Sequence, residues 1–322
     1  MDFVVGINMI AEAIKLGYIP IVDMQYHDNQ YFKDGRKFKD NVWEYYFKQP
    51  CDINLNDISK IENNELIRVF TQPYLQVDEY GAKNIPMRWL STKREADNFV
   101  YKEIIKQTLK LSDEMQSYIV KNNVIEKDEK VLGILCRGTD YIYRRPFGHT
   151  IPAKPYMLIK EAKELKKRFD YTKIYVATED LEIYNEFKKV FGNMMIPNTQ
   201  YMYKRYEKAD LLLAEVKVER QNHNYLLGTE YLASMYMLSK CKYLIASNNC
   251  TGLNFVSVFS NFYKDMEYVH IWDRGKYGVS KKVKYNNIFE RIFSVKNEQN
   301  EDIVRKVITL FGIKIKLKKK TI

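Results

Sequence analysis

The sequence predicts an α/β protein built around a parallel sheet. From residue 131 onward, short apolar runs that are typical of buried strands alternate with amphipathic stretches of helical length. Strands that alternate with helices in this way pair in parallel, and helices then cover both faces of the sheet. With 46% apolar residues the chain can fill a large core, and its 322 residues suit two domains at roughly 150 residues each.

The first third of the chain predicts fewer regular elements. Residues 8–16 are expected to form a helix that Gly17 ends, and residues 18–23 a short buried strand. Either residues 2–5 supply the strand that should precede this helix, or the chain begins after it. Residues 24–95 are irregular, and residues 94–122 predict one long amphipathic helix. The charged residues 126–130 mark the boundary that we expect between domains 1–125 and 126–290.

The second domain predicts a regular alternation. The expected strands are 131–135, 173–177, 194–196, 243–246 and 268–272, and the expected helices are 155–169, 181–191, 230–239 and 252–259. Residues 291–322 are expected to form a third segment, with a short amphipathic helix over 303–313. Five lysines between residues 314 and 320 then make a basic tail.

Polar residues follow three of the predicted strands. Ligands of parallel α/β sheets bind beyond the carboxyl ends of the strands, so these residues are expected to converge on one crevice. Arg137 offers a planar fork to a phosphate, and Gly138 allows close approach to the backbone. Asp140 is placed to orient the arginine or to accept a proton from a hydroxyl. The alternative is an Arg–Asp pair that caps the next turn.

The other two strand ends have structural alternatives as well. Thr178, Glu179 and Asp180 are either ligand-binding residues or a helix start with Thr178 as N-cap and acids in the first turn. The third strand end either binds an anion through backbone N–H groups or is an ordinary capping turn. Its residues are Ser247, Asn248, Asn249, Cys250 and Thr251. His149 and Glu230 are weaker candidates for the crevice, because a lone histidine is commonly structural and Glu230 suits a helix cap.

Several classes of protein lack support in this sequence. The four cysteines form no C-x-x-C pair and no D-x-D occurs, so we expect neither a metal nor a cofactor. No G-x-G-x-x-G or Walker motif indicates a dinucleotide enzyme or a P-loop ATPase. The net charge of +11 suits a phosphorylated ligand, a nucleic acid or an anionic membrane, but no RNA-recognition signature is present. We expect no transmembrane helix and no signal peptide.

Three motifs together resemble the donor domain of the α-1,6/O-fucosyltransferase superfamily. They are the strand end at residues 137–140, the F-x-H-x-I pattern at 147–151 and the A-T-E-D sequence at 177–180. Residues 237–249 are similar to the "LSxADFLVxTxSS" stretch of that family. Residues 13–23 and 42–47 are similar to members from bacterial capsule and O-antigen clusters.

The resemblance implies a GT-B-like fold, in which two Rossmann-like domains face each other across a cleft. The acceptor-side domain would be 1–125, and 126–290 would bind the nucleotide sugar. It implies metal-independent, inverting transfer of fucose from GDP-fucose to a glycan hydroxyl, in the cytoplasm and for surface polysaccharide synthesis. Arg137 falls on the family arginine that contacts the donor diphosphate, and residues 249–251 fall where family side chains meet phosphate. Asp140 falls on the motif aspartate, and Glu179 and Asp180 fall on the family's T-D-D pair.

The sequence also departs from the family pattern. Leu135 and Gly138 replace basic residues around the arginine, Ser234 replaces an aspartate near the guanine, and Arg145 stands where an acid occurs in the family. Another nucleotide sugar is therefore an alternative donor, and a catalytically inactive scaffold or a nucleic-acid-binding protein is an alternative function. Asp140 and Glu179 both remain candidates for the base.

The expected partners are the donor and a glycan or lipid-linked glycan acceptor, with no nucleic acid. Residues 303–322 predict peripheral contact with an anionic membrane, at the inner face of which such an acceptor would lie. The alternative is that the tail is a disordered, solubilising segment.

Overall fold

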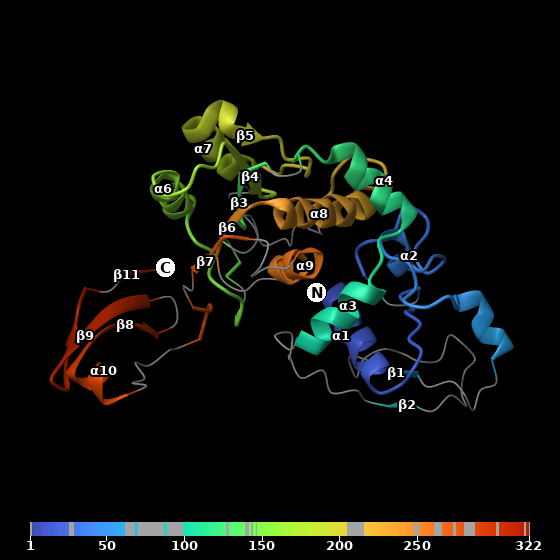
Figure 1. Ribbon diagram of the computed structural model, residues 1–322, viewed down its shortest axis with the longest axis horizontal. Helices are drawn as coiled ribbons and strands as arrows, with labels where there is room; N and C mark the ends of the chain where they lie inside the picture. The colour runs from blue at the N-terminus through green and yellow to red at the C-terminus, as the bar shows by residue number, and fades with distance from the viewer. Residues whose placement is uncertain are drawn as a thin grey trace. The chain divides into compact units, whose positions relative to one another are not determined.

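The computed structural model groups the chain into two compact units (Figure 1). Unit 1 comprises Met1–Ile125, Lys217–Lys240 and Thr251–Asp265, and unit 2 comprises Glu126–Val216, Cys241–Cys250 and Met266–Ile322. The residues described are 2–25, 29–61, 68–69, 87–88, 99–126, 129–138, 142, 144–145, 147–204, 216–247, 251–260, 266–272, 275–279, 287–300, 303–318 and 320–321. The assignment of acceptor and donor domains stays a prediction.

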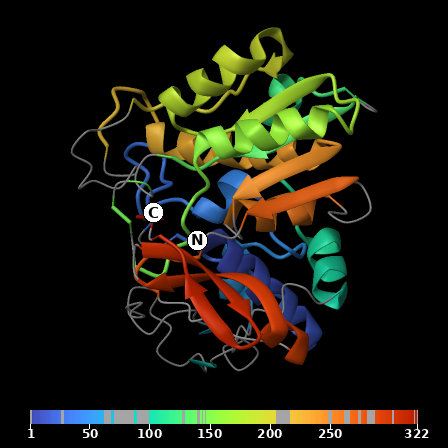
Figure 2. The same cartoon turned by 90° about the vertical axis from the view of Figure 1, so that its left-hand side faces the viewer.

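Unit 2 contains a five-stranded parallel sheet, labelled in Figure 1. Its strands are β3 (Val131–Leu135), β4 (Lys173–Ala177), β5 (Met195–Ile196), β6 (Tyr243–Ser247) and β7 (Tyr268–Trp272), in the order β5-β4-β3-β6-β7. In Figure 2, β6 and β7 are the two orange arrows that lie side by side. The register places Leu135 beside Ala177 on one neighbour and Ala246 on the other. The α/β class and the parallel sheet predicted from the sequence are confirmed.

Apolar strand residues and two helices form the core of unit 2. All five residues of β3 are buried, as expected for a central parallel strand. Leu132, Ile134 and Ile174 pack with Leu158 of α6 (Pro155–Lys166) and Phe187 of α7 (Leu181–Phe191). A proline begins α6 at a position where its missing N–H has no helical partner to lose. The 3-10 turn η3 (Gly192–Met194) joins α7 to β5.

The end of the chain is a sheet, so the predicted helix over 303–313 is wrong. Strand β9 (Ile303–Leu310) pairs antiparallel with β8 (Phe293–Asn300), with β10 (Ile313–Lys316) and with β11 (Lys320–Thr321). The short helix α10 (Ile288–Ile292) precedes β8. Phe311 and Gly312 have φ of 47° and 82°, which a helix does not allow, and residues 313–317 alternate between apolar and basic.

The described part of unit 1 consists mainly of helices. They are α1 (Asp2–Lys15), α2 (Val42–Tyr46), the 3-10 helix η1 (Leu55–Lys60), α3 (Phe99–Thr108), α4 (Asp113–Asn122), α8 (His223–Lys240) and α9 (Thr251–Phe259). Strands β1 (Arg68–Val69) and β2 (Met87–Arg88) form one short parallel pair. A strand over residues 2–5 is wrong because they lie in α1, and residues 18–23 form no strand. The long helix expected over 94–122 is interrupted where Ser112 caps α4.

An aromatic cluster explains why α8 groups with unit 1. Phe3, Trp43 and Phe47 have ring centroids 4.7–6.1 Å apart, and the buried ring of Tyr46 stacks on Tyr225 of α8 at 5.9 Å. The Tyr46 hydroxyl donates a hydrogen bond of 2.9 Å to the Tyr225 carbonyl, which satisfies its polar end inside the core. Burial raises the pKa of Tyr46 well above its usual range.

Candidate functional site

The strand order of unit 2 marks one place on the sheet for a ligand. From β3 the chain continues to β4 and β5 on one side, and it then returns to β6 and β7 on the other side. The carboxyl ends of β3 and β6 therefore form a topological switch point, where open α/β sheets bind their ligands. Strand β3 ends at Leu135, and Cys136, Arg137 and Gly138 follow it at this point.

Glu179, at the end of β4, holds the residues that follow β3. Its Oε1 atom lies 4.0 Å from Nε of Arg137, and it accepts a hydrogen bond of 3.4 Å from the backbone N–H of Gly138. The side chain of Glu179 is 9% exposed and that of Arg137 is 21% exposed. One buried carboxylate thus holds the backbone N–H of Gly138 and lies at ion-pair distance from the guanidinium, and part of the Arg137 side chain stays accessible.

Gly138 lies too close to the start of α7 for any side chain. A Cβ atom built on Gly138 would be 2.6 Å from Cβ of Asp180 and 2.8 Å from Cδ1 of Ile183. Because Gly138 has no side chain, the backbone after β3 can approach the start of α7 closely. Its absent side chain lets the ends of β3 and β4 stay together, which keeps Arg137 against Glu179.

Asp180 is the N-cap of α7 in the place expected for Thr178. Its Oδ1 atom accepts a hydrogen bond of 3.0 Å from the N–H of Ile183, and Asp180 has no exposed surface. Thr178 is only 1% exposed, and its hydroxyl accepts a bond of 3.2 Å from the N–H of Asp180. A helix does start here, but Thr178 as its N-cap is wrong, because Asp180 holds that position. A donor contact by either side chain stays a prediction.

Replacing Asp180 by alanine is expected to destabilise the protein by about 1 kcal/mol, the usual cost of losing an N-cap acceptor. Asp180→Asn keeps an acceptor and should unfold close to the wild type. Urea unfolding of both variants measures the difference. Equal loss of stability in the two variants would show that the negative charge of Asp180, and not its cap, is what matters.

Sequence reasoning missed the side chain that braces the end of β4. The amide nitrogen of Asn198 donates to the carbonyls of Val176 and Thr178, both at 3.0 Å, and its oxygen accepts from the N–H of Gln200. Nearby, the N–H of Tyr203 donates to the Glu179 carbonyl at 2.8 Å. The polar residues after the predicted strand at 194–196 indicate a turn. They do not indicate that this turn folds back onto the end of β4.

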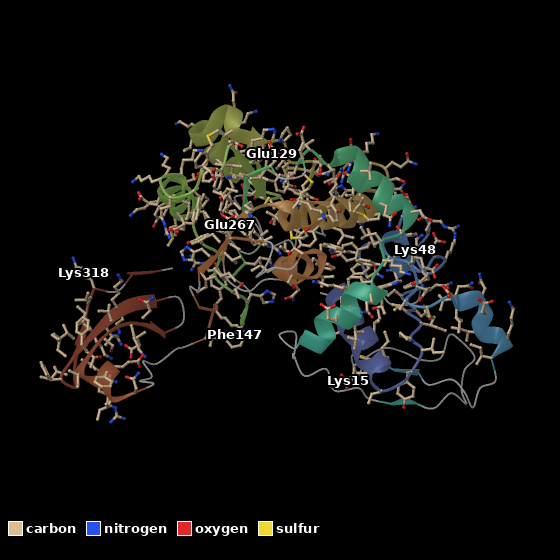
Figure 3. All side chains as sticks on the ribbon, viewed as in Figure 1. Lys15, Lys48, Glu129, Phe147, Glu267 and Lys318 are labelled. Carbon is tan, nitrogen blue, oxygen red and sulfur yellow. The ribbon has the colours of Figure 1, made fainter. Side chains whose placement is uncertain are left out.

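His149 lies in a segment that pairs with the residues after β7. Its carbonyl accepts a hydrogen bond from the N–H of Tyr277, and the N–H of Ile151 donates to the carbonyl of Gly275, so residues 148–151 pair with the segment that follows β7. Phe147, labelled in Figure 3, is 79% exposed beside Gly278. A donor contact by His149 stays a prediction.

Glu230 does not cap a helix, so that expectation is wrong. It lies in the middle of α8, because the helix begins at His223 and not at residue 230. Its buried carboxylate pairs with Arg220 at 2.6 Å, and Nε of Arg220 donates to Nδ1 of His223 at 3.2 Å. All three residues belong to unit 1.

Burial lowers the pKa of His223 below 6.5, and the nearby charge of Arg220 lowers it further. Below pH 6.5 the unfolded chain therefore binds a proton that the folded chain takes up only at lower pH. The free energy of unfolding is expected to fall as the pH drops through this window, and less so in His223→Gln. Urea unfolding between pH 7 and pH 5 tests this, with His149→Gln as control. The same pH slope in His223→Gln and the wild type would contradict it.

The remaining expected site residues lie outside the described side chains. Asp140 and residues 248–250 are not described, and only the backbone of Ser247 and of Thr251 is. Among the described side chains, no three His, Cys, Asp or Glu residues are grouped so that they could hold a metal ion. No helix in the described ranges is long and apolar enough to cross a membrane.

A surface cavity of about 500 Å³ lies in unit 1. Glu44, Lys48, Cys51, Asn54 and Asp113 are among the residues that line it, and Lys48 is labelled in Figure 3. None of the residues predicted from the sequence as site residues lines this cavity.

Comparisons with known proteins give matches among solved structures. No protein-family model matches the sequence, and neither does any curated protein. The fucosyltransferase NodZ from Bradyrhizobium is similar, with 11% identity, a TM-score of 0.47 and coverage of 79% of this chain and 86% of that chain. NodZ α-1,6-fucosyltransferase co-crystallised with GDP has 12% identity and a TM-score of 0.46 over 79% and 86% of the two chains. POFUT1 in complex with GDP has 9% identity and a TM-score of 0.36 over 60% and 57%.

Proposed function

We propose that this protein is a glycosyltransferase that binds a nucleotide sugar at the carboxyl ends of β3, β4 and β6. The observation that carries the proposal is the position of Arg137 at the switch point of the sheet, fixed there by the buried carboxylate of Glu179. A guanidinium in this place can form paired, charge-assisted bonds to a diphosphate. The positive net charge of the chain favours the approach of such a ligand.

The proposed reaction is an inverting displacement. The oxygen of an acceptor hydroxyl attacks the anomeric carbon, the bond from that carbon to the diphosphate oxygen breaks, and the nucleoside diphosphate leaves with the electron pair. Arg137 stabilises the negative charge that develops on the leaving group. The hydroxyl proton passes to a carboxylate, for which Asp140 and Glu179 are the candidates.

The resemblance of the sequence motifs to the fucosyltransferase superfamily supports GDP-fucose as the donor. A glycan or lipid-linked glycan as acceptor, a role in surface polysaccharide synthesis and a cytoplasmic location rest on the same resemblance. The contact of Glu179 with Arg137 favours a positioning role for Glu179, which leaves Asp140 as the candidate to take the proton.

Thermal unfolding with GDP, UDP, CMP and ADP tests the proposal, because a ligand that binds only the folded state stabilises it by mass action. GDP is expected to give the largest shift, and Arg137→Ala should abolish it. A larger shift with UDP would overturn fucose as the sugar, and no shift with any nucleotide would overturn the proposed function.

Release of GDP from GDP-fucose is expected to continue in EDTA, because Arg137 and backbone N–H groups would neutralise the leaving group without a cation. Loss of activity in EDTA, restored by Mn²⁺, would contradict this mechanism. In the same assay Glu179→Gln separates its two possible roles. A positioning role predicts weaker donor binding with an unchanged pH profile, whereas a role as base predicts that the profile changes.

A further inference from the structure

The C-terminal sheet has one apolar face that no described residue covers. Side chains alternate between the two faces of a strand, and paired residues of neighbouring strands share a face. The register therefore places two rows on one face, Phe293–Leu310–Ile313 and Val295–Ile308–Ile315. The exposed fractions on this apolar face are Phe293 62%, Val295 52%, Leu310 39%, Ile313 68% and Ile315 45%. The sheet is the red arrow group in Figures 1 and 2.

The described side chains on the opposite face of the same sheet include buried residues and ion pairs. Val307 and Thr309 have no exposed surface there. Glu298 pairs with Arg305 at 2.6 Å and with Lys316 at 3.2 Å, and both partners keep the pKa of the Glu298 carboxyl below its usual range. A small sheet of this kind is stabilised by burying a hydrophobic face, and here the apolar face is the one still open.

The open apolar surface continues to one end of the sheet. Phe311, in the turn between β9 and β10, is 83% exposed, and its N–H donates to the carbonyl of Ile292 at the end of α10. In α10 itself Ile288 is 69% exposed and Phe289 is 74% exposed. Together, these side chains extend the apolar face into an apolar tip.

Exposed basic side chains lie beside this surface. Lys306 lies on the apolar face one row beyond Ile308, whereas Lys314 of the edge strand β10 pairs with Thr309 and so lies on the opposite face. Lys318, which follows that strand, is also exposed and is labelled in Figure 3.

We propose that this face and its tip bind the surface of an anionic lipid bilayer, with Phe311 inserted among the lipids and the lysines at the level of the headgroups. Interfacial binding grows with the apolar area that is buried and with the attraction of basic side chains to anionic lipid.

A second copy of the chain fits the surface less well. Strands β8, β9 and β10 lie side by side at a spacing of about 4.8 Å. Their two apolar rows and the row of Lys306, about 7 Å apart, give a face of roughly 300 Å². A stable protein interface buries about 800 Å² on each partner. The lysines of two facing copies would also repel each other, whereas anionic lipid attracts them.

Co-sedimentation with phosphatidylcholine vesicles, with and without phosphatidylglycerol, tests the proposal. The full chain is expected to pellet with the anionic vesicles only, and less so as NaCl is raised. Phe311→Asn should lower the partition constant at least about tenfold, which is what burying one aromatic side chain contributes. Asparagine tolerates the positive φ of 47° at this turn, so this variant should fold.

Matched variants distinguish vesicle binding by the proposed surface from nonspecific adsorption of the protein. Ile313→Ser should weaken binding, whereas Ile19→Ser should not, although Ile313 is 68% exposed and Ile19 is 67% exposed. Lys306→Gln with Lys318→Gln should weaken binding about twenty-five-fold, at about fivefold for each basic residue. Lys39→Gln with Lys189→Gln, two exposed lysines elsewhere, should leave binding almost unchanged.

Three outcomes would overturn the proposal. One is equal loss in the test and control variants, and another is no binding to the anionic vesicles. The third is a dimer in lipid-free solution that Ile313→Ser dissociates, which would assign the surface to a second copy. None of these outcomes depends on nucleotide binding, so the proposed function and this inference can fail separately.

Discussion

Arg137→Lys is expected to lower kcat almost as far as Arg137→Ala. The proposed role of Arg137 is to present a planar fork to the leaving diphosphate, and the point charge of lysine does not replace that geometry. Losing a preorganised charge-assisted contact to the leaving group should cost on the order of 2–4 kcal/mol of transition-state stabilisation, or about 10²–10³-fold in kcat. Steady-state release of GDP from GDP-fucose measures the effect.

Arg168→Lys is the matched control for this substitution. Arg168 is an exposed arginine of unit 2 that lies beside the ring of Phe169, remote in sequence from the ends of the strands. Its replacement should leave kcat within experimental error of the wild type. Activity of Arg137→Lys within about threefold of the wild type would assign Arg137 a purely structural role, because a group that acts by its fork loses more than that.

Gly138→Ala is expected to destabilise the protein and to abolish nucleotide binding together. The added methyl group would lie 2.6 Å from Cβ of Asp180, so the backbone after β3 or the start of α7 must move. Overpacking of this kind costs about 1–3 kcal/mol of folding free energy. The same movement would pull the Gly138 N–H and Arg137 away from the Glu179 carboxylate. Urea unfolding and the thermal shift with GDP measure the two effects.

Gly35→Ala provides the comparison for that variant. Gly35 has a φ of 68° and open space around it, so alanine there meets backbone strain and no neighbouring atom. It should lose some stability and keep the full shift with GDP. If Gly138→Ala also keeps the full shift with GDP, the loop after β3 does not bind the nucleotide.

The central sheet could be predicted from the sequence because its strands are buried on both faces. Residues 131–135 and 174–177 are short runs without charged residues. The structure gives β3 and β4 the bounds predicted for them, 131–135 and 173–177. The helix expected over residues 8–16 is present, but its start at Asp2 and the C-terminal strands were misjudged, for a different reason. Short apolar runs, at residues 2–5 and again at 303–313, suit a helix and a strand equally well, so tertiary packing decides between them.

The candidate site could be predicted only in part. The sequence predicted that the strand ends bearing Arg137 and Glu179 converge, because parallel strands end at one edge of the sheet, but not that these two side chains are in contact. The brace by Asn198 joins residues about 20 positions apart and has no local pattern. The start of α8 also escaped prediction, since this helix is apolar on all sides and shows no periodicity that marks its first turn. Glu230 was therefore taken for a cap.

Amide hydrogen exchange with and without a bound nucleoside diphosphate tests the central claim most directly. The ligand is the one that gives the largest thermal shift among GDP, UDP, CMP and ADP. We expect slower exchange in residues 136–138 and 179–182, where the ends of β3 and β4 meet, and no such protection in Arg137→Ala. Protection confined to other segments, or unchanged exchange at these strand ends in the saturated complex, would contradict it.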